Sequence, residues 1–193
     1  MTVDPYVDPR TGVLRNRLGI TDATVLAQAE ARLAAAAEIV LFTEHLDLGH
    51  YDLSHLRAIH HHLFGAVYDW AGELRTVNMT KGDTAFALVE WLEPQAEQVF
   101  AWLTDEHHLL DRHRDQFVEG ASRFLSDLNA LHPFREGNGR TQRAFLRRLA
   151  ADAGWHLAWS EVDPAENAAI SAAAMADRRA FVPLFDRILH PLA

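Results

Sequence analysis

The chain contains 193 residues, carries a formal net charge of −9 and has no cysteine. Its length predicts one domain over residues 1–193, with an arm and a helix in residues 1–50 and a core in about 51–193. The acidic balance argues against direct binding of nucleic acid, which usually needs a basic excess. The lack of cysteine excludes disulfides and thiolate metal sites. No stretch is apolar for long enough to span a membrane, and residues 1–10 hold no secretory signal, so we expect a cytoplasmic protein without a membrane partner.

The first two predicted helices follow from capping residues and apolar spacing. Thr21 can cap an alanine-rich helix that we expect to reach about Leu46. Asp52 can cap a second helix with a single apolar stripe, and Gly72 is expected to end it. The stripe comprises Leu56, Ile59, Leu63, Val67 and Trp70.

A short β-hairpin is predicted next, because residues 75–79 and 84–87 flank a turn at Lys81-Gly82-Asp83. The edge of such a hairpin has unpaired N–H and C=O groups, to which an extended segment of another protein can add as a strand. The candidates for this docking edge are Thr76, Val77 and Asn78. An ordinary surface hairpin is the alternative interpretation.

The turn of this hairpin contains Lys81, the only lysine among 18 basic residues. Lys81 and the adjacent Gly82 suit a place where a slim cation approaches a phosphate or a target segment, although chance also explains a single lysine. The hairpin therefore supplies one candidate cation for a phosphate site.

The rest of the chain reads as helical. Pro94 suits the first turn of a third helix that reaches about Thr104. A long fourth helix has apolar residues at i, i+4, i+7, i+11 and i+14. These residues are Phe117, Ala121, Phe124, Leu128 and Leu131. Further helices are expected over 141–153, 164–176 and 178–189, with a short extended piece at 155–159. The predicted fold is an all-α bundle with one β-hairpin flap.

The run from His132 to Arg143 contains several groups that can bind phosphate and move a proton. Gly137 and Gly139 flank Asn138, so this backbone can adopt positive φ and form a nest of N–H groups before a helix. A helix N-terminus favours anions through its free N–H groups and its dipole. The run is not a Walker A loop, because it lacks Gly-x-x-x-x-Gly-Lys-Ser/Thr.

The charged side chains of the run complete a candidate phosphate site. Arg140 and Arg143 share one face of the helix, and a guanidinium binds phosphate oxygens as a planar fork. Glu136 is a hard oxygen ligand that suits Mg²⁺ shared with phosphates. His132 titrates near neutral pH and can accept a proton from an attacking hydroxyl. Each feature alone has an ordinary structural explanation, and their fixed spacing makes the functional interpretation the stronger one.

The same run resembles the Fic family signature His-x-Phe-x-(Asp/Glu)-Gly-Asn-Gly-Arg-x-x-Arg at every defined position. Residues 59–77 are similar to the family's upstream helix and the start of its flap, and residues 6–19 are similar to the start of compact bacterial members. The positions that match the signature are His132, Phe134, Glu136, Gly137, Asn138, Gly139, Arg140 and Arg143.

The resemblance implies a protein adenylyltransferase that transfers AMP from ATP to a Ser, Thr or Tyr hydroxyl and releases pyrophosphate. By this resemblance His132 deprotonates the hydroxyl and Glu136 carries Mg²⁺. Phe134 anchors the loop in the core without chemistry. The remaining residues bind ATP: Gly137, Asn138 and Gly139 form the anion hole, and Arg140 and Arg143 hold the β- and γ-phosphates.

Gly139 separates two reactions within the wider family. The related Doc-type toxins are kinases and carry Lys at this position, where a lysine would fill the space for a phosphate and turn the ATP around. Gly139 leaves the space open, so we expect AMP transfer.

The sequence also bears on regulation. Many Fic proteins carry an inhibitory helix with the pattern Ser/Thr-x-x-x-Glu-Gly/Asn, whose Glu pairs with the second arginine of the signature. Glu166-Asn167 comes closest here, but Val162 stands at the Ser/Thr position. We therefore expect a toxin whose inhibitory Glu comes from a separate small antitoxin. A bacterial type II topoisomerase subunit is a family-level expectation for the target.

Other interpretations remain open. The chain could use a different nucleotide, remove AMP, or be a catalytically silent Fic scaffold that binds a partner. The consecutive residues His60, His61 and His62 point in three directions on a helix and cannot hold one metal ion together. The second group, His107, His108 and His113, is also expected to be solvated and not a zinc site.

Overall fold

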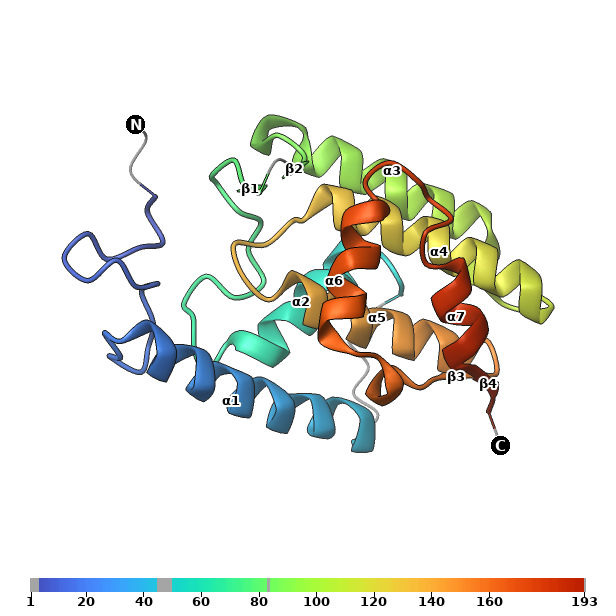
Figure 1. The fold of residues 1–193 in the computed structure, drawn as a ribbon, viewed down its shortest axis with the longest axis horizontal. Coiled ribbons are helices and arrows are strands. Elements are labelled where there is room, and N and C mark those ends of the chain that lie inside the picture. Colours follow the sequence, from blue (N-terminus) through green and yellow to red (C-terminus); the bar gives the residue numbers. More distant parts are fainter. Residues whose placement is uncertain (1–3, 45–49, 83, 193) are drawn as a thin grey trace.

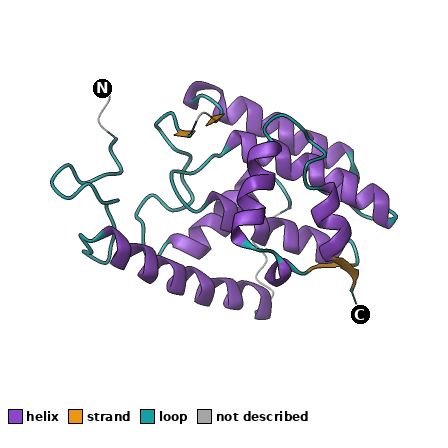
Figure 2. Ribbon diagram, viewed as in Figure 1, coloured by secondary structure: helices purple, strands orange, loops and turns teal. Residues whose placement is uncertain are grey.

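A computed structural model describes residues 4–44, 50–82 and 84–192 of the chain. Helices make up most of it, as Figures 1 and 2 show. The α-helices are α1 (Ala23–Thr43), α2 (Leu53–Phe64), α3 (Leu92–Asp105), α4 (Arg114–Leu131), α5 (Asn138–Asp152), α6 (Pro164–Ala173) and α7 (Val182–Ile188). The strands are β1 (Thr80–Lys81), β2 (Thr84–Ala85), β3 (Trp155–Leu157) and β4 (Leu189–Pro191). Short 3-10 turns occupy Val89–Trp91, His107–Leu109 and Trp159–Glu161.

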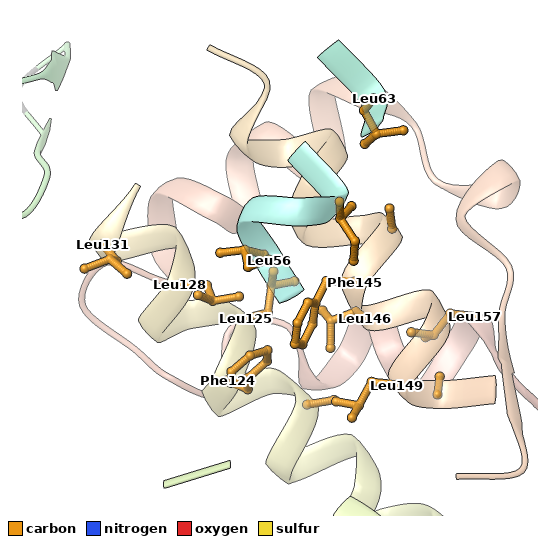
Figure 3. Close-up of a cluster of buried hydrophobic side chains, with 14 of the residues drawn as sticks. Leu56, Leu63, Phe124, Leu125, Leu128, Leu131, Phe145, Leu146, Leu149 and Leu157 are labelled. Atoms are coloured by element: carbon orange, nitrogen blue, oxygen red, sulfur yellow. The ribbon is translucent and has the colours of Figure 1, made fainter. Parts of the chain in front are cut away.

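The core lies where α2, α4 and α5 meet, and Figure 3 shows their apolar side chains converging. The predicted stripe of α4 is buried along its whole length, from Phe117 to Leu131. On α5, Phe145, Leu146 and Leu149 are fully buried. Burial of each such side chain contributes about 1.5–3 kcal/mol, so this contact fixes the two helices that flank the loop from His132 to Gly137.

The ends of the first two helices differ from the predicted ends. Asp22, not Thr21, caps α1, because its carboxylate accepts the backbone N–H of Val25 at 2.9 Å. The predicted end at Leu46 lies outside the described residues. Asp52 caps α2 as predicted, with a bond of 2.7 Å from the backbone N–H of His55.

The second helix stops at Phe64, well before Gly72. The backbone N–H groups of Val67 and Tyr68 both bond to the carbonyl of Phe64, a shared acceptor that is common at a helix end. The carbonyl of Val67 then accepts the N–H of Arg17 at 2.8 Å, a bond from the N-terminal arm. Contact with a distant segment thus replaces continued helical bonding.

Two small antiparallel sheets accompany the helices. The predicted hairpin exists, with Thr80 opposite Ala85 and Lys81 opposite Thr84, but its strands are shorter than expected. The second sheet was not predicted: β3 pairs with β4 and sets His156 opposite His190. The helix predicted over 178–189 is confined to Val182–Ile188, because residues 178–181 form turns and Leu189 begins β4.

Helix α6 is shorter than predicted, since it ends at Ala173 and not at residue 176. Asp163 caps it and Pro164 occupies its first position, as the sequence suggests. Within the described ranges, no helix is both long and apolar enough to cross a bilayer.

Candidate active site

A cavity of about 420 Å³ is lined by residues of the hairpin, of the loop that joins α4 to α5, and of α6. Figure 1 shows where these elements lie in the fold. This volume is in the usual range for small-molecule sites. The loop and α5 contribute His132, Arg135, Glu136, Gly137, Asn138, Gly139, Gln142 and Arg143 to its wall. The flap contributes Met79, Thr80, Lys81 and Phe86, and the opposite wall contains Asn167, Ala168 and Ser171 of α6.

His132 is the residue after α4 and has left-handed backbone angles, φ 47° and ψ 61°. Its ring stacks on Phe86 with centroids 3.8 Å apart, so the base of the flap holds one face of the imidazole. Burial lowers the pKa of His132 to about 4, and the positive charges of Arg75 and Lys81 act in the same direction. The histidine is therefore neutral near pH 7 and able to accept a proton.

The N-terminus of α5 faces the cavity. The helix begins at Asn138 and not at residue 141, so Gly139 lies in its first turn. Only Gly137 of the two glycines has positive φ, at 80°, and a Cβ there would lie 2.5 Å from the ring of Phe64. The expectation of positive φ at Gly139 is wrong, because the residue is already helical. The first N–H groups of a helix have no acceptor within the helix and are available to an anion.

Asn138 stabilises the loop through its side chain. Its Oδ1 accepts the backbone N–H of Phe134 at 2.9 Å, and its Nδ2 donates to the carbonyl of the same residue at 2.7 Å. Phe134 is 1% exposed and stacks on His60 at 3.9 Å. Only the backbone of Asn138 is thus left to meet a ligand.

His60 is a structural residue of the site that the sequence did not predict. Its side chain was expected to be solvated but is fully buried. The backbone N–H of Gly72 donates to Nδ1 at 2.7 Å, so the ring hydrogen lies on Nε2, which donates to the carbonyl of Glu136 at 3.0 Å. Burial lowers the pKa of His60 to about 4, which keeps this tautomer neutral. The signal in the sequence was the i, i+4 spacing of His60 with Leu56 and Phe64.

The neighbouring histidines also have partners. His61 Nδ1 is 2.9 Å from the carbonyl of Ala71, and His62 Nε2 is 2.8 Å from the carbonyl of Ala37. In the part of the chain that the structure describes, no group of three or more His, Asp or Glu side chains could hold a metal ion.

Glu136 is the one signature carboxylate on the cavity wall. Its Oε1 accepts the backbone N–H of Gly137 at 2.9 Å and lies 3.6 Å from Arg140. The side chain is 44% exposed, so it remains accessible from the cavity. Mg²⁺ in nucleotide sites is usually bound by one or two carboxylates together with substrate phosphates, and a single open carboxylate fits that need.

The two signature arginines are in different environments. The guanidinium of Arg140 pairs with the buried carboxylate of Glu30 on α1 and lies over the ring of Phe64, 4.6 Å from its centroid. Arg140 is not on the cavity wall, whereas Arg143 is. Burial lowers the pKa of Arg143, and no described carboxylate forms an ion pair with it. The cation offered to the cavity by α5 is therefore Arg143.

The predicted docking edge borders a groove of about 700 Å³ that shares the lining residues Met79, Thr80 and Arg135 with the cavity. Thr76, Val77 and Asn78 all line this groove, although none of them is in a strand. Lys81 is exposed beside the cavity, and Gly82, at φ 58°, borders a smaller adjoining cavity of about 270 Å³.

The N-terminal arm supplies contacts that no local pattern revealed. Asp4 pairs with Arg135 at 2.9 Å, and the hydroxyl of Tyr6 accepts the backbone N–H of Thr76 at 3.0 Å. The ring of Tyr6 also packs on the edge of Trp70, with centroids 5.3 Å apart. The arm therefore forms one wall of the groove, and residues of the flap form another.

The site combines a helical bundle, a hairpin, a glycine-containing helix start and a histidine just before it. This combination defines a class of proteins, and comparison with known proteins identifies that class. Residues 50–150 match the Fic/DOC family model. The chain is 42% identical over 163 residues to protein adenylyltransferase VbhT of Bartonella schoenbuchensis, covering 84% of this chain and 34% of VbhT. It is 35% identical over 187 residues to "Probable protein adenylyltransferase Fic" of Escherichia coli, covering 96% of this chain and 92% of the relative.

A solved structure agrees with these relatives. The N-terminal Fic domain of a Bartonella quintana effector protein with bound ADP superposes with a TM-score of 0.87 at 27% identity. The match covers 96% of this chain and 94% of that one. The chain belongs to the Fic/DOC family, and the all-α fold with a hairpin flap is confirmed. It spans only about a third of the length of VbhT.

Proposed function

We propose that this chain transfers AMP from ATP to a hydroxyl of a target protein. The chain is a nucleotidyltransferase, in keeping with the relatives named protein adenylyltransferase. The observation that carries the proposal is that the neutral His132 shares a cavity with the N-terminus of α5 and with Arg143. A base, an anion site and a cation then lie within reach of one triphosphate.

ATP binds in this proposal with its phosphates at the N-terminus of α5. The backbone N–H groups of Asn138 and Gly139 meet phosphate oxygens, and Arg143 holds the terminal phosphates. Lys81 approaches the same phosphates from the flap. The adjoining cavity of about 270 Å³, bordered by Phe86 and Met175, is the candidate site for the base.

Arg140 has a supporting role here. Because its guanidinium is paired with Glu30, it stabilises the start of α5 and not a phosphate directly. Glu136 is the residue that would hold Mg²⁺, which supplies positive charge to the phosphates when bound.

The reaction needs one proton transfer and one exchange of bonds. His132 accepts the proton of the target hydroxyl while the hydroxyl oxygen forms a bond to the α-phosphorus. The bond from the α-phosphorus to the bridging oxygen of the β-phosphate breaks, and pyrophosphate leaves with that electron pair. Catalysis of this kind depends on positioning and on stabilising charge, which the loop and α5 supply.

The target segment lies in the groove between the flap and the N-terminal arm. An extended peptide can pair with the backbone of residues 76–78, which brings a hydroxyl toward His132 with little dependence on its sequence. A Ser, Thr or Tyr hydroxyl is acceptable in this scheme. The groove of about 700 Å³ that Thr76, Val77 and Asn78 line is the place for such a segment in this proposal.

The biological context that we propose is a toxin controlled by a small antitoxin. Arg143 is open to the cavity, and the nearest approach to an inhibitory motif does not reach it, because Glu166 pairs with Arg187 at 2.7 Å. A Glu from a second protein could therefore bind Arg143 and block the phosphates. A bacterial type II topoisomerase subunit remains the proposed target.

Isotope position tests the reaction. The purified chain is incubated with a bacterial lysate, Mg²⁺ and ATP labelled at the α- or the γ-phosphate, beside His132→Ala. Label that reaches protein from the α-position and disappears in His132→Ala is the expected result. Label from the γ-position alone would make the chain a kinase, and no label from either position would favour the silent scaffold. Other labelled nucleotides in parallel test nucleotide preference.

A further inference from the structure

Arg75 is a fully buried cation that no carboxylate neutralises among the described residues. Its side chain is 1% exposed, and burial lowers its pKa. Its guanidinium donates only to backbone carbonyls, at 2.8 Å to His132, 2.7 Å to Val77 and 3.3 Å to Leu131, with a further short bond to Ala87. A buried charge is costly unless its hydrogen bonds are satisfied, so this arrangement has to be well formed to persist.

These four carbonyls come from two parts of the site. Leu131 and His132 form the C-terminus of α4, where the partial negative charge of the helix dipole compensates a cation. Val77 and Ala87 lie on the two segments that lead into and out of the hairpin, before β1 and after β2, which we call the two legs of the flap. Only the planar fork of an arginine offers donors in enough directions to join all of them.

The main chain of Arg75 adds a second connection. Its backbone N–H donates to the carbonyl of Pro133 at 2.9 Å, so Arg75 contacts three successive carbonyls around His132. His132 has a left-handed backbone conformation, which residues other than glycine rarely adopt without support. The carbonyl contacts hold the chain in this conformation and thereby set the direction of the imidazole ring.

We propose that Arg75 is a positioning residue that joins the flap and His132 into one rigid unit, so that a strand added to the flap presents its hydroxyl in register with the imidazole. The inference rests on the proposed function, because it assigns His132 as the base. It predicts that Arg75 affects the transfer step and the rigidity of the flap far more than nucleotide binding, most of which α5 supplies.

Arg75→Lys keeps the positive charge but has a single nitrogen that cannot reach both legs of the flap and the end of α4. Arg57→Lys is the matched control. Arg57 also joins a helix, α2, to the segment just before Arg75. It donates hydrogen bonds of 2.8 Å to the carbonyl of Gly72 and 2.7 Å to the carboxylate of Glu73, but it contacts neither the flap nor His132. Both variants and the wild type are compared.

Two measurements separate the inference from the proposed function. Amide hydrogen exchange of residues 76–80 and 84–87 reports the flap without any need for activity. We expect faster exchange there in Arg75→Lys, and exchange like the wild type in Arg57→Lys. Unchanged flap exchange in Arg75→Lys would overturn the inference, even if the wild type proved inactive.

Single-turnover transfer from α-labelled ATP into lysate proteins is the second measurement. We expect Arg75→Lys to lose about 100-fold in rate, the size of effect that a displaced catalytic group causes, with a much smaller change in the Kd for a non-hydrolysable ATP analogue, because α5 keeps its phosphate contacts. A wild-type rate, or a loss of analogue binding as large as the loss of rate, would contradict a positioning role. A wild type that transfers nothing refutes the proposed function instead.

Discussion

The guanidinium of Arg140 forms an ion pair with the carboxylate of Glu30, a residue of α1 that lies 110 positions earlier in the chain. The same carboxylate accepts the hydroxyl of Tyr68, and its side chain is only 8% exposed. Two arginines that share one helix face thus have different partners, since α1 binds the first while the second, Arg143, faces the cavity.

Alanine substitutions should separate the two arginines. Arg143→Ala removes charged hydrogen bonds to phosphate and should weaken binding of an ATP analogue by about 1.5–3 kcal/mol, with the free energy of unfolding almost unchanged. Arg140→Ala leaves Glu30 buried without its partner and should destabilise the fold by about 3 kcal/mol. Calorimetric titration and urea unfolding measure the two quantities. An Arg140→Ala protein of normal stability that no longer binds the analogue would reverse the assignment.

The two glycines of the signature make a second matched pair. A methyl group at Gly137 would meet the ring of Phe64 at 2.5 Å and strain a backbone at φ 80°, so Gly137→Ala should lose about 2 kcal/mol or more of stability. A methyl group at Gly139 meets only the mobile end of Arg143, at 3.2 Å, in a helical backbone. Gly139→Ala should fold normally and bind ATP more weakly. Thermal unfolding and analogue titration decide, and equal destabilisation by both would contradict the geometry.

His60 should matter for stability and for the loop, although it touches no substrate in the proposed reaction. His60→Phe keeps an aromatic ring on Phe134 but leaves the N–H of Gly72 and the carbonyl of Glu136 without their partner. We expect a loss of about 1–3 kcal/mol for each buried group left unpaired. Urea unfolding measures this loss. Wild-type stability in His60→Phe would mean that water replaces both bonds.

The acid dependence of activity should reflect the buried state of His132. Because burial lowers its pKa to about 4 from a reference value of 6.5, the ring stays deprotonated well below pH 6.5. The kcat/KM of transfer should therefore show no decrease near pH 6.5 that belongs to this histidine, and its acidic limb should lie nearer pH 4. A half-maximal rate at pH 6.5 would show that the ring is solvated in the working enzyme.

Stability should depend on pH in a related way. Between pH 6.5 and about 4 the unfolded chain binds protons at His60 and His132 that the folded chain does not bind. The free energy of unfolding then decreases as the pH falls through this window, and neither residue contributes above it. Urea unfolding from pH 7 to pH 4.5 should show a shallower decrease in His60→Phe than in the wild type.

The sequence alone determined the features that depend on residues close together in the chain. The regular spacing from Phe117 to Leu131 was enough to predict α4, and Asp52 was enough to predict the start of α2, because helical bonds and caps join residues within one turn. The run from His132 to Arg143 likewise placed a base, a helix N-terminus and charged groups within a few residues, which limits the chemistry open to them.

Only the tertiary structure decided how those groups are used. Helix ends moved where a distant segment took the backbone bonds, as Arg17 does at Val67. The end of the last helix became a strand because β3 was there to pair with it. Glu30, His60 and Arg75 acquired their roles through contacts across the fold. Such contacts depend on which surfaces pack together. The spacing of His60 with Leu56 and Phe64 can indicate that the ring is buried, but its bonds to Gly72 and Glu136 are set by packing of the whole core.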